Sequence, residues 1–339
     1  MGFVQSATFP TRVVTLLQVG SIRFTAFYLA AFSTAIAATG HDPVPWLAIA
    51  VPLWMVKCLA IELTNRYADR IEDAVNRQER TLLCEQVGYD TIRRAAIGLN
   101  ALVLAFYLAW FAEWRRPELF AVQLVSWLVM WNYSVGLRFK ARRLGVLVAL
   151  CGTFILPFLC GWMIYGEFKS VPLPILAMLV FVFSLSGIKD ITDVEGDAKR
   201  GYRSFFVDVA SRRSAARLLL LLGSPYLFIA GLVAFGAAEP RFLALGVFAP
   251  ISLLFASLVR GAREPHERTT VREWTYQFWY VFLMGILWLV QPTVHNALVL
   301  GGCTLFWVLA TRKLHWAVGL RADQVEDVSR ILSRVFVAS

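Results

Sequence analysis

The sequence predicts an all-α fold, a multispanning transmembrane bundle of nine or ten helices with a cap on the cytoplasmic side and a central cavity. Hydrophobic residues make up 58% of the 339 residues, and mean hydropathy is +0.61. Only 17% of the residues carry charge, well below the roughly 25% that is usual in soluble domains. Apolar runs of about 17 to 25 residues, long enough to cross a bilayer as a helix, recur along the chain.

Ten apolar windows give the candidate spans. They cover residues 14–38, 44–64, 94–113, 119–136, 144–165, 171–189, 214–236, 241–259, 275–292 and 295–311. The last two windows are short, and the proline in Gln291-Pro292-Thr293 allows a single kinked helix instead of two. A topology with nine spans therefore remains an alternative to the topology with ten.

Charge asymmetry predicts the orientation. With ten spans, 27 of the Lys and Arg residues lie on the side that holds both termini and the segments after the even-numbered spans, against 4 on the other side. The positive-inside rule then places both termini in the cytoplasm. The net charge of +10 thus arises mainly from the basic residues that set the topology, which also attract the headgroups of the lipid bilayer. We expect no nucleic acid partner.

The organisation is that of one integral membrane domain over residues 1–339, with a cytoplasmic tail at 312–339. No Pro-, Gly- or Ser-rich linker divides the chain. The polar stretches 65–93 and 190–213 are too long for tight turns, so we expect them to cap the bundle. The five cysteines lack metal-binding spacing and the four histidines accompany no motif, which gives no support to a cysteine metal site or to histidine catalysis.

Two acid-rich segments contain the metal-binding residues that the sequence predicts. One covers residues 65–73 and the other 189–197, and each directly follows an apolar span on the same predicted side. Within each segment the polar oxygens recur every three or four residues, so they share one helix face. Clustered carboxylates at the edge of a membrane are costly without a cation. The candidate metal ligands are Asn65, Asp69 and Asp73 (the first acid row) and Asp190, Asp193 and Asp197 (the second acid row).

Magnesium and a diphosphate fit this pattern. Mg²⁺ takes one or two carboxylates together with substrate phosphates, so two facing rows are expected to hold two Mg²⁺ ions that clamp one diphosphate. Basic residues suited to phosphate oxygens surround the rows. The candidate diphosphate-binding residues are Arg66, Arg70, Arg138, Lys140, Arg200 and Arg203, together with Lys189.

These motifs resemble the paired Asp-rich motifs of the UbiA superfamily of intramembrane prenyltransferases. The resemblance rests on Asn-x-x-x-Asp-x-x-x-Asp at 65–73 and on Lys-Asp-x-x-Asp-x-Glu-Gly-Asp at 189–197. The second motif is most similar to the homogentisate prenyltransferase and chlorophyll synthase branch. The segment 133–140, Tyr-Ser-Val-Gly-Leu-Arg-Phe-Lys, resembles a further element of that family. Arg66 and the Arg-Thr-Leu-Leu stretch at 80–83 depart from the family pattern, which leaves the acceptor open.

The resemblance implies an isoprenyl diphosphate donor, Mg²⁺ and an active-site cavity on the cytoplasmic side. One Mg²⁺ would bind the first acid row and the other the second acid row, with Lys189 on the diphosphate and Tyr133 near the reacting carbon or the acceptor. Tryptophan faces inside the bundle would suit an allylic cation. The catalytic residues expected are Asp69, Asp73, Asp193, Asp197, Lys189 and Tyr133, and the tryptophans are Trp54, Trp127, Trp131, Trp162 and Trp279.

The expected reaction is transfer of a prenyl group to an acceptor, most simply an aromatic ring, after metal-assisted loss of diphosphate. Two alternatives stay within the superfamily: a terpene cyclase, or prenylation of a lipid or sugar phosphate. A secondary transporter, which also has intramembrane acids and about ten spans, is an alternative of another class.

Overall fold

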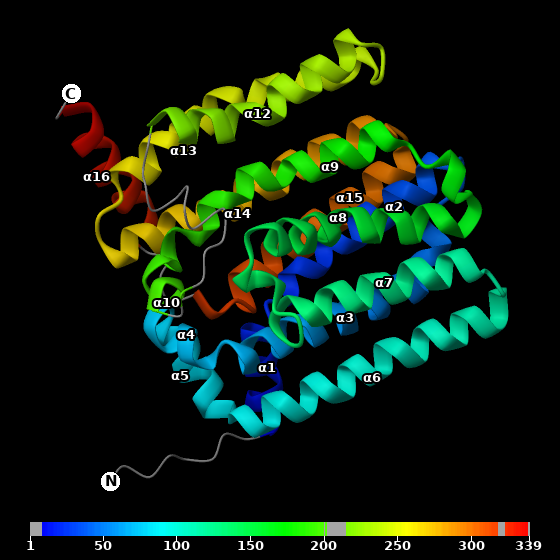
Figure 1. Cartoon of the computed structure of the whole chain (residues 1–339), viewed down its shortest axis with the longest axis horizontal. Coiled ribbons are helices and arrows are strands. Elements are labelled where there is room, and N and C mark those ends of the chain that lie inside the picture. Colours follow the sequence, from blue (N-terminus) through cyan, green and yellow to red (C-terminus); the bar gives the residue numbers. More distant parts are fainter. Residues whose placement is uncertain (1–8, 200, 202–214, 318–322, 338–339) are drawn as a thin grey trace.

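The computed structural model describes residues 9–199, 201, 215–317 and 323–337. All regular elements among these residues are helical, which confirms the predicted all-α class. The long helices run side by side as a bundle (Figure 1). They are α2 (Thr25–Ala38), α3 (Leu47–Ala68), α6 (Tyr89–Trp114), α7 (Pro117–Ser134), α8 (Arg143–Tyr165), α9 (Leu173–Ser186), α12 (Ala215–Ala234), α13 (Ala249–Gly261), α14 (Pro265–Val290) and α15 (Val294–Lys313).

Each predicted apolar window overlaps one of these helices, although several helices extend beyond their windows. Five helical ranges among the described residues are long and apolar enough to cross a bilayer alone, and a sixth arises if Thr11–Val19 and Ile22–Ala38, bent by 59°, count as one span. The Pro292 break separates α14 from α15, so the last two windows are two helices, not one kinked helix. The chain is an integral membrane protein, and nine or ten crossings remain a prediction.

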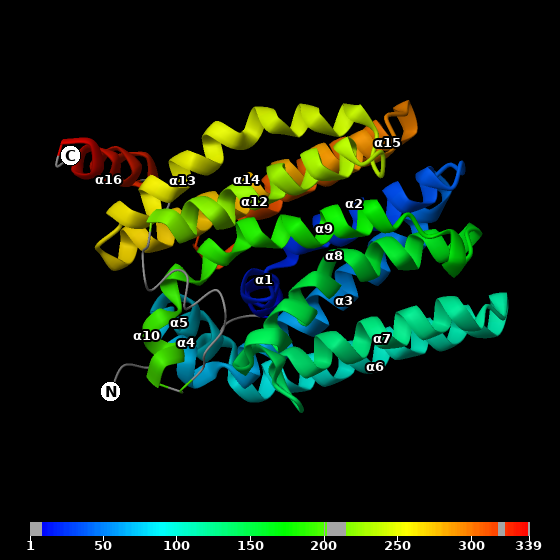
Figure 2. The same cartoon turned by 45° about the horizontal axis from the view of Figure 1, so that its top comes forward.

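Four of the shorter α-helices lie at one end of the bundle. Figures 1 and 2 show α4, α5, α10 and α16 at the end where α3 finishes, away from the turn between α6 and α7. The short α-helices are α1 (Phe9–Val19), α4 (Arg70–Asn76), α5 (Gln78–Val87), α10 (Val194–Lys199) and α16 (Gln324–Val337). The 3₁₀ helices are η1 (Ile22–Phe24), η2 (Val44–Trp46), η3 (Phe139–Ala141), η4 (Phe168–Ser170), η5 (Gly187–Thr192) and η6 (Pro240–Phe248).

The predicted C-terminal tail contains α16, which packs against α13 and α14. Ile331 is fully buried, and a Cβ added to Gly261 would lie 2.7 Å from its Cγ2 atom. The Thr270 hydroxyl at the start of α14 donates to Asp327 Oδ2 at 2.7 Å. The last helix thus fixes the end of α14 that faces the cap.

Close helix contacts and aromatic packing hold the centre of the bundle. A Cβ on Gly161 of α8 would lie 2.1 Å from the Phe32 carbonyl oxygen of α2, so only glycine allows this approach. Small residues at such crossings are typical of membrane bundles, where tight packing replaces the hydrophobic effect. Phe27 of α2 contacts Tyr280 and Trp307 with ring centroids 5.1 and 4.9 Å apart. These contacts join α2, α14 and α15 beneath the capped end.

Candidate active site

A pocket opens at the capped end of the bundle, between α2, α3, α7, α8 and α14. Its empty volume is about 1350 Å³, which includes space open to solvent. Most of the residues predicted from the motifs line it. These are Asn65, Arg66, Asp69, Asp73, Tyr133, Lys140, Lys189, Asp190, Asp193 and Asp197.

The other predicted diphosphate-binding residues are not brought to this pocket. The exposed Arg70 lies over the ring of Tyr67, 6.0 Å from its centroid. Arg138 is exposed on the turn after α7, with a positive φ of 50°. Arg200 and Arg203 fall outside the described residues. Their roles therefore stay predictions without structural support.

The first acid row spans a break between two helices. The shared helix face predicts helical backbone through 65–73, but α3 ends at Ala68 and Asp69 has φ −100° and ψ 12° before α4 begins. The backbone bonds Asp69 N to Asn65 O (2.9 Å) and Asp73 N to Asp69 O (2.8 Å) keep the four-residue repeat across this break. As a result, all three side chains still line the pocket.

The second acid row lies on η5 and α10, a 3₁₀ helix followed by one short α-helix. Asp193 N donates to Asp190 O at 2.9 Å, a three-residue step. Asp197 N donates to Asp193 O at 3.0 Å, a four-residue step. The spacing of three and then four in the sequence matches this change from 3₁₀ to α geometry. It directs all three carboxylates to the same pocket.

Asn76 and Gly196 join the two segments. The Asn76 Oδ1 atom accepts from the Gly196 backbone N–H at 2.8 Å, and its Nδ2 donates to the Asp193 carbonyl oxygen at 3.3 Å. A Cβ on Gly196 would lie 2.4 Å from Nδ2. The absence of a side chain at Gly196 therefore lets α10 lie directly against the end of α4.

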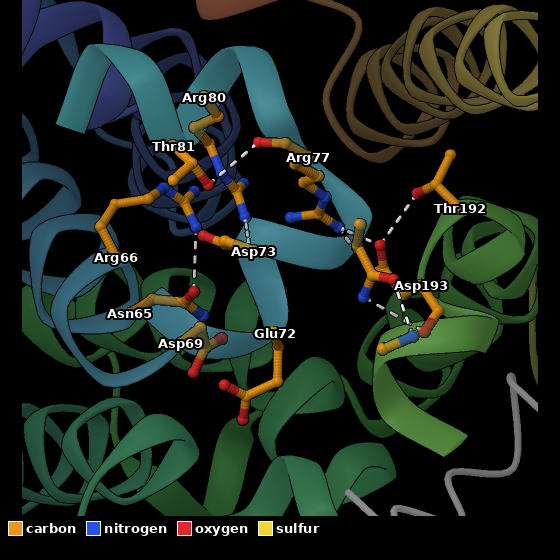
Figure 3. A network of polar contacts seen from close by, with 12 residues as sticks. Asn65, Arg66, Asp69, Glu72, Asp73, Arg77, Arg80, Thr81, Thr192 and Asp193 are labelled. Atoms are coloured by element: carbon orange, nitrogen blue, oxygen red, sulfur yellow. Dashed lines mark hydrogen bonds and ion pairs between the residues drawn. The ribbon is translucent and has the colours of Figure 1, made fainter. Parts of the chain in front are cut away.

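Basic side chains neutralise the acids in this structure. Arg77 Nη2 donates to Asp193 Oδ1 at 2.6 Å, and Arg80 pairs with Asp73 (Figure 3). Lys140 pairs with Asp69, and Lys189 Nζ lies 2.6 Å from Asp190 Oδ1. Each pairing offsets part of the cost of removing the two charges from water.

Arg66 holds the first acid row in place. Its Nε donates to the Val19 carbonyl at 2.9 Å, its Nη1 donates to Asn65 Oδ1 at 2.9 Å, and its Nη2 pairs with Glu62. This arrangement gives Arg66 a supporting role toward Asn65 in addition to the predicted diphosphate contact.

Sequence reasoning missed several residues of the pocket. Arg77 continues the helix face of Asp73 by four residues, so its spacing was a usable signal. Arg272 and Tyr276 come from α14, where no motif marks them. The missed residues that line the pocket are Arg23, Glu62, Glu72, Asn76, Arg77, Arg80, Arg272 and Tyr276.

The acids differ in how firmly they are held ionised. Burial alone raises a carboxyl pKa, yet the charges of Arg77, Arg272 and Lys189 hold the pKa of Asp193 below its usual range. Burial raises the pKa of Asp197 to about 7, and the charges of Asp193 and Asp190 add to this effect. The pocket therefore has a firmly ionised carboxylate beside one that is easily protonated.

An aromatic wall lies beside the charged part of the pocket. The rings of Phe27 and Phe154 are each close to Trp279, with centroids 5.4 and 5.2 Å away, and Tyr276 lies 5.9 Å from Trp279. Phe24 and Tyr28 also line the pocket. Of the tryptophans proposed from the sequence, only Trp279 is a lining residue; Trp54, Trp127, Trp131 and Trp162 are not.

The donor set suits Mg²⁺. No three His, Cys, Asp or Glu side chains converge as a metal cage in the part of the chain that the structure describes. Mg²⁺ does not require one, because it keeps waters and takes one or two carboxylates with substrate phosphates. The first acid row offers an amide and two carboxylates to the pocket, and the second acid row three carboxylates. These residues fit that cation.

The fold and the pocket define a helical membrane protein with a polar, acid- and arginine-rich site above an aromatic wall. The model of the UbiA prenyltransferase family matches residues 26–282, which is most of the chain. The chain belongs to this family and is a prenyltransferase. Membership removes the transporter alternative, whereas the branch suggested by the second motif stays a prediction.

Comparison with solved structures gives the same fold. A digeranylgeranylglyceryl phosphate synthase matches with a TM-score of 0.53 and 15% identity, over 83% of this chain and 99% of that one. A UbiA homologue from Archaeoglobus fulgidus bound to GPP and Mg²⁺ matches with a TM-score of 0.54 and 16% identity, over 86% and 99%. The same homologue bound to DMAPP and Mg²⁺ gives 0.52 and 16%, over 86% and 99%. No curated protein matches the sequence.

Proposed function

We propose that this prenyltransferase moves a prenyl group from an allylic isoprenyl diphosphate to an aromatic ring. The proposal is based on one pocket, in which two acid rows and several basic side chains lie next to an aromatic wall. The Archaeoglobus fulgidus homologue, which binds GPP or DMAPP with Mg²⁺, supports both the donor class and the metal.

Two Mg²⁺ ions would be held by the two acid rows. The first would bind Asn65, Asp69 and Asp73, and the second would bind the second acid row with Asp193 as its most firmly ionised member. Bound Mg²⁺ neutralises the negative charge that develops on a departing diphosphate.

The basic residues would exchange partners when substrate binds. Lys140, Lys189, Arg77 and Arg80 now pair with carboxylates of the rows. Metal at those carboxylates would free the ammonium and guanidinium groups to donate to phosphate oxygens, which accept charged donors strongly. The pairs thus keep the site neutral and ordered before substrate arrives.

The chemical step breaks the C–O bond of the allylic diphosphate, and the bonding electrons leave with the diphosphate oxygen. The allylic cation lies against Phe27, Trp279 and Tyr276, whose ring faces attract positive charge. The acceptor ring supplies the electron pair for the new C–C bond. The ring proton then passes to pyrophosphate or water, so no side chain is needed as base. Tyr133 lines the same pocket and would lie near the reacting carbon or the acceptor.

Two other outcomes use the same ionisation step. A terpene cyclase would close the cation on its own chain, and another member could prenylate a lipid or sugar phosphate. The aromatic wall favours a flat acceptor ring, because rings stack on one another at favourable offsets.

The test is incubation of the purified protein in lipid nanodiscs with Mg²⁺ and radiolabelled allylic diphosphates, with and without aromatic acids. We expect pyrophosphate release and a labelled, ring-containing product that both require Mg²⁺. A labelled hydrocarbon formed without acceptor would contradict aromatic transfer and identify a cyclase. Lack of pyrophosphate release from every allylic diphosphate would contradict the proposed function as a whole.

We also propose that the capped end faces the cytoplasm. The excess of Lys and Arg on that predicted side supports this orientation. A tag placed after Ser339 should be accessible to protease in inverted membrane vesicles and protected in intact cells; the reverse pattern would contradict it.

A further inference from the structure

Arg272 is a pocket residue that none of the motifs includes. It lies near the start of α14, far from both acid rows in the sequence, yet it lines the same pocket as Arg77 and Asp193. Its side chain is only 4% exposed. Two rings fix its direction, since the guanidinium carbon lies 5.0 Å from the Trp316 centroid and 5.7 Å from that of Tyr276.

The guanidinium of Arg272 has N–H donors that make no hydrogen bond. Its Nε and Nη1 atoms are buried without a hydrogen-bond partner. Its Nη2 lies 3.5 Å from Glu273 Oε1, too long for a good hydrogen bond. Among the described arginines that line the pocket, Arg272 is the one with two such nitrogens. Burying unpaired donors of a charged group costs free energy, and a bound ligand that accepts from them would recover it.

Neighbouring charges explain why Glu273 does not satisfy Arg272. The other carboxylate oxygen, Oε2, accepts from Arg23 Nη1 at 2.9 Å and lies 3.1 Å from His315 Nε2. Burial lowers the pKa of His315 to about 3, helped by the charge of Arg23, so the ring is neutral. Glu273 is therefore committed mainly to Arg23, and Arg272 keeps a positive charge next to the acids of the pocket.

We propose that Arg272 is a further catalytic residue that donates to the diphosphate of the substrate from the C-terminal half of the chain. This inference rests on the proposed function. Metal-bound acid rows and their lysines would hold the diphosphate from α3, α4, η3, η5 and α10, and Arg272 from α14. Guanidinium groups suit this role because they donate two parallel bonds to phosphate oxygens.

The inference is tested by binding of inorganic pyrophosphate, measured by calorimetry on the protein in nanodiscs, with Mg²⁺ and separately with EDTA. Three variants are compared with the wild type: Arg272→Gln, Arg272→Lys, and Arg260→Gln as control. Arg260 is an exposed arginine at the end of α13 that does not line the pocket. The thermal unfolding midpoint of each variant is recorded alongside.

We expect Arg272→Gln to weaken pyrophosphate binding by roughly 10- to 100-fold, because hydrogen bonds to a charged group are lost. The loss should persist in EDTA, Arg272→Lys should recover part of it, and Arg260→Gln should bind normally. Unchanged affinity in Arg272→Gln overturns the proposal, as does a loss seen only with Mg²⁺. If Arg272→Gln does not fold, Arg272→Lys serves as the test, because wild-type pyrophosphate affinity in that variant also overturns the proposal.

The outcome is separable from that of the proposed function. A wild type that binds pyrophosphate but ionises no allylic diphosphate would disprove the proposed function. The comparison of pyrophosphate affinities would still test the role of Arg272. A wild type that does not bind pyrophosphate would contradict both.

Discussion

Arg77 and Asp193 connect the two acid-rich segments directly: Arg77 Nη2 lies 2.6 Å from Oδ1 and 2.5 Å from Oδ2 of Asp193. Both side chains are about 15% exposed, so the pair is largely shielded from solvent. The contact joins the turn between α4 and α5 to the start of α10. The cap is thus held together by the same carboxylate that we assign to the second metal.

Arg77→Gln should lower turnover by at least about tenfold, because it removes a cation that keeps Asp193 ionised and orders the cap. The measurement is Mg²⁺-dependent pyrophosphate release at saturating metal. Arg94→Gln, at an exposed arginine of α6, serves as control and should behave as wild type. Equal rates in the two variants would show that the contact has no role in turnover.

Gly196→Ala should separate the two acid rows. The new Cβ would lie within 2.4 Å of Asn76 Nδ2, so α10 must shift from α4. We expect a destabilisation of about 1–3 kcal/mol and a higher Mg²⁺ requirement. Gly231→Ala on α12 is the control, because a Cβ there meets no atom within 4 Å. A normal Mg²⁺ requirement in Gly196→Ala would argue against close contact of the rows.

Trp279→Leu, which removes the aromatic face, should slow the ionisation step and leave diphosphate binding unchanged. Trp279 forms the aromatic wall with Phe27 and Phe154, and the proposed cation gains about 0.5–2 kcal/mol from a tryptophan face. Single-turnover measurements should therefore show a reduction of roughly 2- to 30-fold. A larger loss in pyrophosphate affinity than in rate would place Trp279 at the leaving group, contrary to this assignment.

His315 should make stability depend on pH. Its folded-state pKa of about 3 lies below the ordinary 6.5, so the unfolded chain binds more protons between these values. Stability from the neutral ring is complete above pH 6.5 and declines as pH falls toward 3. Between pH 8 and pH 5 this amounts to about 2 kcal/mol. The fall in unfolding midpoint should be smaller in His315→Gln; an equal fall would exclude His315 as the source.

The sequence was sufficient for the fold class, the apolar helices and the two acid rows. Hydropathy identifies membrane helices because lipid requires a long apolar surface. The unequal spacing of Asp190, Asp193 and Asp197, from which the sequence predicts a shared helix face, matches the change from 3₁₀ to α geometry.

The rest of the site depends on tertiary packing. Arg272 and Tyr276 belong to α14 and reach the acid rows only because the bundle closes, which no local spacing encodes. Likewise, five tryptophans were equivalent candidates for the aromatic wall, and only helix rotation in the bundle selects Trp279. The exposed positions of Arg70 and Arg138 have the same cause, since the direction of a side chain is set after each helix ends.

The central claim is that the two acid rows act as one metal-dependent site for an allylic diphosphate. The most direct test is pyrophosphate release from geranyl diphosphate as Mg²⁺ is varied, for wild type, Asp69→Ala and Asp193→Ala, with folding checked by thermal unfolding. We predict that the wild type is Mg²⁺-dependent and that each folded variant loses turnover by about 10²-fold or more, since each removes a group that stabilises the transition state. Near-normal turnover in both variants would contradict the claim.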